Sequence, residues 1–153
     1  MKLRFSRIDD LVTYVERIHV ERHSRTRSWT AGQIFFHLAA AFEGSMHGLP
    51  PGYPAIVRFV IRPMRWFVTK LKLPPMLPIP SSALKELSPP EDVDFECEKS
   101  RLLDAISEFE RFTGDHPAHP VLGKLTRLEW IGFHLRHCEH HLSFIRCDSI
   151  SES

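Results

Sequence analysis

The residues best suited to chemistry are histidines gathered near the C-terminal end of the sequence. Four of the ten histidines lie between residues 134 and 141. A helix turns by about 100° per residue, so five side chains would fall within one stripe of roughly 80°: Trp130, His134, His137, His141 and Phe144. His137 and His141 are one turn apart and would point the same way. Two neutral imidazoles at that spacing, about 5 to 6 Å apart, could hold a divalent metal ion.

The rest of this predicted helix indicates that the histidine row borders or enters the core. A neighbouring stripe is apolar and comprises Leu128, Ile131, Leu135, Cys138 and Leu142. We expect Arg136, Glu139 and Ser143 on the opposite face. Buried imidazole nitrogens need partners. A shared cation would satisfy several of them at once, and the alternative is a row of mutually hydrogen-bonded imidazoles without metal.

His134, one turn before the pair, is the candidate catalytic residue, as a fourth ligand or a proton carrier. No clear general base accompanies it, because Glu43 lies about 120° from His37 around its helix and Glu139 faces away from His137. His140 is expected to support a ligand or to lie at the surface. Cys138 lies on the apolar stripe, which favours an inert core thiol over a nucleophile.

Three other histidines are expected in or beside loops, where a histidine is usually solvated: His47, His116 and His119. Of these, His119 precedes the last predicted helix and could line the mouth of a pocket. His19 lies on the apolar face of the first predicted helix, where a lone imidazole is usually a hydrogen-bonded core residue.

The composition is that of an ordinary globular protein with one domain spanning residues 1–153. The apolar fraction is 42%, the charged fraction is 25% and the formal charge is +1. A general nucleic-acid binder usually carries a clear cationic excess, so that class is disfavoured. The three cysteines lack a framework spacing and no apolar N-terminal leader is present, which predicts a reduced, cytoplasmic setting.

Apolar residues at helical spacing predict four helices and no competing strands. Their approximate ranges are 8–23, 30–47, 95–113 and 127–146. With one long connection between the second and third, they predict an all-α, antiparallel four-helix bundle. The sequence leaves open whether the protein forms a homodimer.

Local signals mark where the predicted helices begin and end. The second begins at a capping box formed by Thr30 and Gln33, and the fourth begins at another formed by Thr126 and Glu129. Asp94 can cap the third, and Gly114 fits its C-terminal stop. The second helix is apolar on nearly every side and carries one imidazole, His37, in its middle. That imidazole could reach the depth of His137 in the bundle.

The predicted crossover, residues 48–93, differs in composition from the rest of the chain. Ten of the twelve prolines lie between residues 48 and 90, and no acidic residue occurs between 44 and 85. Residues 55–72 are apolar and basic, and could form a short or kinked helix that is too short and too charged to span a bilayer. The plain interpretation is a connection packed over the bundle. The alternatives are a membrane-surface or partner-binding module, or a basic rim that attracts an anionic substrate.

Two segments together resemble the DinB/YfiT-like superfamily of metal-binding four-helix bundles. The first is Trp29-Thr-Ala-Gly-Gln33 leading to His37-Leu38, and the second is Trp130 followed by His137-Cys-Glu-His140-His141-Leu. The segment from His119 to Thr126 looks like an uncharacterised branch of that group. The resemblance covers about a third of the chain.

The resemblance implies a divalent metal ion, such as nickel, zinc or iron, held by three histidines from two helices. Carried over by position, the ligands are His37, His137 and His141. The superfamily includes transferases and isomerases that use low-molecular-weight thiols, proposed hydrolases and members without known activity. It therefore implies a small-molecule substrate without naming it, and the proline-rich crossover departs from a compact bundle.

Overall fold

The computed structural model describes residues 3–19, 29–48, 88–120 and 122–145. These residues form four α-helices: α1 (Ile8–Glu16), α2 (Ala31–His47), α6 (Phe95–Arg111) and α7 (Arg127–Leu142). Within the described part, β structure is limited to an isolated bridge between His119 and Gly123. The predicted all-α class with four helices is confirmed. Most of the predicted crossover, including the segment 55–72, lies outside the described residues.

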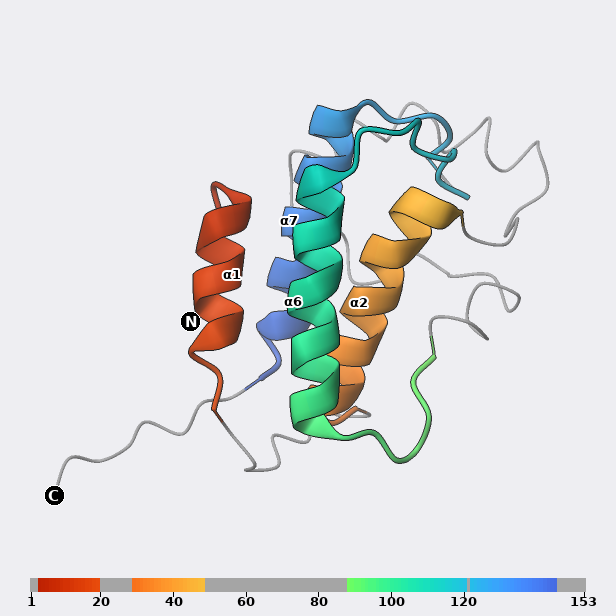
Figure 1. Cartoon of the computed structure of the whole chain (residues 1–153). Helices are drawn as coiled ribbons and strands as arrows, with labels where there is room; N and C mark the ends of the chain where they lie inside the picture. Colours follow the sequence, from red (N-terminus) through yellow and green to blue (C-terminus); the bar gives the residue numbers. More distant parts are fainter. Residues whose placement is uncertain (1–2, 20–28, 49–87, 121, 146–153) are drawn as a thin grey trace, which may run out of the picture.

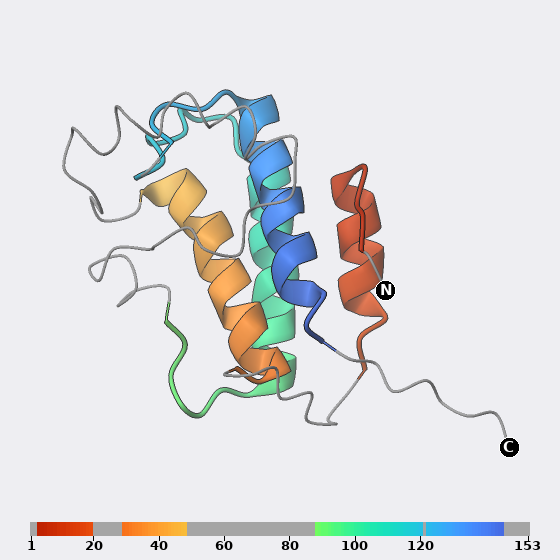
Figure 2. The same cartoon turned by 180° about the vertical axis from the view of Figure 1, so that it is seen from behind.

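The four helices pack side by side along a common direction (Figures 1 and 2). In both views α2 and α6 run in the same direction, whereas α1 and α7 run in the opposite one. The most extensive helix–helix contact joins α2 to α6. Helix α7 also packs against α1 and α2. No helix in the described part of the chain is long and apolar enough to cross a membrane.

The core lies where α2, α6 and α7 meet, and α1 covers one side of it. Phe35, Phe42 and Phe109 are fully buried there, together with Trp130. Apolar burial of this kind is the main driving force for folding, at about 25 cal/mol per Å² removed from water. The core therefore fixes the depth at which α2 and α7 face each other.

The predicted helix starts are confirmed by side-chain hydrogen bonds. Thr30 Oγ1 accepts from the Gln33 amide at 3.2 Å, and Gln33 Oε1 accepts from the Thr30 amide at 2.8 Å. Thr126 and Glu129 form the same reciprocal pair at the start of α7. Asp94 Oδ1 accepts from the Cys97 amide at 2.7 Å and starts α6. These caps set the register of the two helices that carry the histidines.

Helix α1 ends at Glu16, whereas the sequence predicted a helix to residue 23. The buried ammonium of Lys99 on α6 donates to the carbonyls of Glu16, at 3.0 Å, and Ile18, at 2.8 Å. An ammonium group from another helix thus binds carbonyls at and just beyond the C-terminal end of α1, which therefore need no intrahelical partners. Residues 20–23 lie outside the described part, and His19 is exposed rather than buried in the core.

Helix α6 ends at Arg111, three residues before the predicted glycine stop at Gly114. The guanidinium of Arg127, the first residue of α7, donates to three carbonyls at this end, those of Phe109, Glu110 and Phe112. A side chain from the next helix therefore closes α6, so that no glycine is needed.

Helix α7 ends at Leu142 rather than near residue 146, and one side of it was wrongly predicted. Arg136 and Glu139, expected opposite the core, are 6% and 1% exposed. Glu139 Oε1 accepts from the Phe5 amide at 2.6 Å, and Arg136 donates to the Phe5 carbonyl at 2.5 Å. The two side chains also form an ion pair at 2.8 Å. The segment before α1 therefore covers this side of α7, while Leu128, placed on the apolar stripe, is 80% exposed.

Candidate metal centre

His37 on α2 lies beside His137 and His141 on α7. The Nε2 atoms of His37 and His137 are 3.1 Å apart. One nitrogen from each of the three rings lies within 4.8 Å of the other two. His37 is buried, and the other two are half-buried. The sequence prediction that these three imidazoles converge is confirmed, and they are compatible with a metal site.

The distance between two of the nitrogens fits a shared divalent transition ion. Nitrogens bound at about 2.1 Å to one ion lie roughly 3.0 to 3.4 Å apart in octahedral or tetrahedral geometry. The 3.1 Å between His37 Nε2 and His137 Nε2 falls in that range. A hydrogen bond between those atoms would pair two of the three nitrogens, whereas an ion would serve all three. The all-nitrogen donor set suits nickel, zinc or iron.

The electrostatics keep the imidazoles of His137 and His141 neutral. Burial, followed by the nearby His141 and His37, holds the pKa of His137 well below its usual value. Burial, followed by His37 and His140, lowers the pKa of His141 to about 3. At neutral pH both rings therefore keep the lone pair that a metal ion requires.

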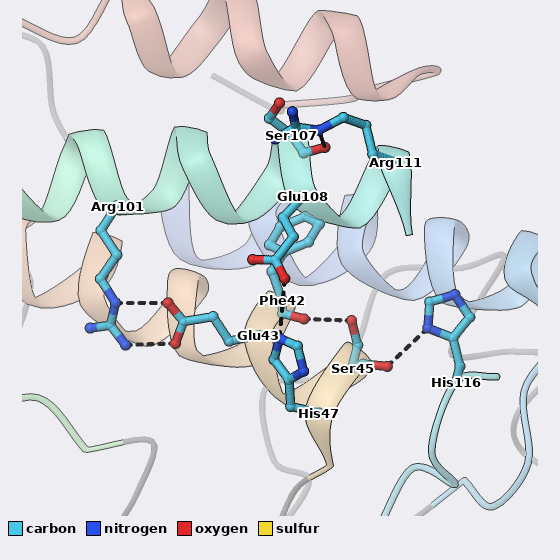
Figure 3. A network of polar contacts seen from close by, with 9 residues as sticks. All are labelled: Phe42, Glu43, Ser45, His47, Arg101, Ser107, Glu108, Arg111 and His116. Atoms are coloured by element: carbon cyan, nitrogen blue, oxygen red, sulfur yellow. Dashed lines mark hydrogen bonds and ion pairs between the residues drawn. The ribbon is translucent and has the colours of Figure 1, made fainter. Parts of the chain in front are cut away.

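The described carboxylates near this part of the bundle are engaged elsewhere. Glu43 on α2 forms a two-pronged pair with Arg101 on α6, with N···O distances of 2.9 and 2.7 Å (Figure 3). Glu139 is held by Arg136 and Phe5. In the described part of the chain, the group with metal-ligand spacing consists of the three histidines alone. None of these carboxylates would therefore neutralise the positive charge of a bound divalent ion.

His134, the predicted catalytic residue, points into an aromatic part of the core. Ser45 Oγ donates to the Phe42 carbonyl at 2.6 Å, so it accepts the Nε2–H of His134 at 3.0 Å. The ring of His134 stacks on Phe42 with centroids 3.9 Å apart. Burial, and then His119 and His116, holds the pKa of His134 well below its usual value. The structure does not group it with the three ligand candidates, so its role as a fourth ligand or proton carrier stays a prediction.

Two of the loop histidines are held in place rather than solvated. His116 Nδ1 donates to the Ser45 carbonyl at 2.9 Å, as Figure 3 shows. His119 Nδ1 accepts from the Leu122 amide at 3.1 Å, and its ring packs on Trp130. Ser45 was not predicted from the sequence, although a serine on a largely apolar helix is a signal of a buried polar contact.

His47 and His140 are the remaining histidines of α2 and α7. His47 is exposed and contacts Glu108 at 3.2 Å, which agrees with a surface position (Figure 3). His140 is half-buried and its ring lies 5.0 Å from that of His141. Cys138 is fully buried, as expected for a core thiol, and burial raises the pKa of its thiol.

Trp29 packs against two of the three histidines, His37 and His141. Its ring lies 5.0 Å from that of His37, and it stacks on His141 at 5.9 Å with the planes 16° apart. From the sequence, Trp29 was recognised only as part of a motif, and its contact with the histidines was not predicted. No local signal could place its ring, because the stacking depends on the register between α2 and α7.

Comparison with known proteins identifies the family without naming an activity. No curated protein and no solved structure gives a significant match. A family described as "Protein of unknown function (DUF1569)" matches residues 1–148. Because the match spans nearly the whole sequence, the chain belongs to the DUF1569 family.

Proposed function

We propose that this protein is a metal-dependent enzyme whose divalent ion is held by His37, His137 and His141. The convergence of three imidazoles from two helices is the observation that carries the proposal. Its sequence resemblance to the DinB/YfiT-like superfamily supports the same ligands. The reaction is that of a thiol-dependent transferase or a hydrolase acting on a small molecule. Free thiols at Cys97 and Cys138 suit a reducing, cytoplasmic compartment.

Three protein ligands leave coordination positions open, as in catalytic rather than structural sites. When bound, the ion would lower the pKa of a coordinated water or thiol and polarise a substrate oxygen. The chain's own contribution is to hold three imidazoles in place and to keep those of His137 and His141 neutral. The described carboxylates near the site are committed to arginines, so the ion itself would supply most of the activation.

Metal analysis tests the site directly. Protein purified without a metal-affinity tag and reconstituted with nickel, zinc or iron should hold about one ion per chain. His37→Gln, His137→Gln and His141→Gln should each lose stoichiometric binding. His47→Gln is the matched control, because His47 is exposed and contacts Glu108 instead. A wild-type protein without stoichiometric metal would end the proposal.

The two reaction classes can be separated with cobalt. In Co²⁺-loaded protein, a thiol that enters an open position produces a sulfur-to-cobalt charge-transfer band in the near ultraviolet. Titration with a small thiol should produce that band if the protein is a thiol-dependent transferase. A visible spectrum that stays unchanged at saturating thiol would favour the hydrolase.

A further inference from the structure

His137 differs from most metal-binding histidines in how its ring is oriented. Such histidines usually donate the other ring N–H to a carboxylate, carbonyl or water, which fixes the ring. Nδ1 of His137 is buried and has no hydrogen-bond partner among the described residues. Glu139, the nearest carboxylate in sequence, is turned away and bonded to Phe5. Contacts with the rings of His37 and His141 therefore have to orient this ring.

His141 needs such a contact most. It stands in the last turn of α7, one residue before the helix ends at Leu142. Helix ends fray, so the backbone constrains this ring less than it constrains His137 one turn earlier. His141 is also half-buried, whereas His37 is buried.

Trp29 supplies a contact to rings from both helices. It stacks nearly parallel on His141 and lies tilted against His37. Aromatic pairs of this kind add about 0.5 to 1.5 kcal/mol beyond the area they bury. Trp29 immediately precedes Thr30, whose capping box fixes the start of α2. The indole is therefore anchored to the helix that carries His37 while it covers the face of His141.

We propose that Trp29 is a positioning residue that holds the His141 and His37 rings in the orientation needed to bind the metal ion. This inference rests on the proposed function and adds a residue that acts through ring stacking. It explains why a large aromatic side chain stands directly before the cap of α2.

Metal affinity is the test, measured by competition with a chelator of known affinity. Trp29→Leu keeps an apolar side chain but removes the ring, and should weaken binding by about tenfold to a hundredfold, the range found for groups that orient metal ligands. Trp29→Phe keeps a ring and should recover most of the affinity. Phe144→Ala is the matched control, because Phe144 contacts the ring of His140 at 5.0 Å and is 44% exposed.

A spectroscopic measurement separates positioning from general stability. The visible spectrum of Co²⁺-loaded protein reports coordination geometry, and Trp29→Leu should change it while circular dichroism of the metal-free variant stays helical. Wild-type affinity and spectrum in Trp29→Leu would overturn the inference and leave the proposed function standing. A wild-type protein that binds no metal would instead remove both.

Discussion

The buried contact between α7 and the segment before α1 makes a strong prediction about stability. Substituting Glu139 by alanine removes the carboxylate that accepts from the Phe5 amide and pairs with Arg136. The Arg136 guanidinium would then be a buried cation without its counter-charge, because its side chain is only 7% exposed. We expect a large loss of folding free energy.

The magnitude follows from the burial of the pair. Breaking a buried ion pair by removing one partner destabilises a protein by about 3 to 5 kcal/mol. For a protein of this size, that loss lowers the melting temperature by roughly 6 to 20 °C, at about 2 to 4 °C per kcal/mol. The double variant Arg136→Met with Glu139→Leu should recover part of the loss, since no unpaired charge remains. Recovery should be incomplete, because the Phe5 amide and carbonyl still lose their partners.

Urea and thermal unfolding of the metal-free protein measure this effect without interference from ligand binding. Asp9→Ala is the control, because the Arg7–Asp9 pair has the same kind of charges but is exposed at 76% and 67%. Exposed pairs contribute at most about 1 kcal/mol. A Glu139→Ala variant that unfolds within 1 kcal/mol of wild type, as the control should, would refute the reasoning.

Three further predictions concern a histidine, a glycine and a thiol. Burial lowers the pKa of His119 from its usual value of 6.5 to about 4. Between pH 6.5 and pH 4, the unfolded chain therefore binds a proton at this residue and the folded chain does not. Stability of the metal-free protein should therefore fall by about 1.4 kcal/mol per pH unit from this residue between pH 6.5 and 4, and His119→Asn should show a shallower dependence; parallel curves would contradict this. Gly123 has a φ of 75° with open space around its Cβ position, so Gly123→Ala should cost about 1 to 2 kcal/mol in urea unfolding, and a neutral effect would count against a purely conformational role. An alkylating agent applied to the native protein should modify the exposed Cys97 and spare the buried Cys138. Mass spectrometry of the digested protein can check this, and equal labelling would contradict the burial of Cys138.

The parts of the fold that were predictable from sequence are those set by neighbouring residues. The caps at Thr30, Asp94 and Thr126 depend on groups three positions away in the sequence, and all three are present. The end of α1 was wrong because it is set by Lys99, which is 83 residues from Glu16. Helical periodicity carries no information about a cation arriving from another helix.

The candidate site shows the same division. The phase of His137 and His141 on one helix followed from their spacing, and the resemblance added His37. The burial of Arg136 and Glu139 was missed because Phe5, their partner, lies 131 and 134 residues away. The bond of His134 to Ser45, 89 residues away, could not be predicted from helical spacing, and the role of His134 at the ion stays a prediction.

The same long-range pairing determines when the site can form during protein synthesis. Phe5 leaves the ribosome before its partner Glu139, which follows 134 residues later. His37 likewise faces a ring 100 residues further along. Domains whose contacts join distant parts of the chain complete folding only when both parts are available. The three imidazoles can therefore come together only after α7 has been synthesised, and an ion would be acquired no earlier than that.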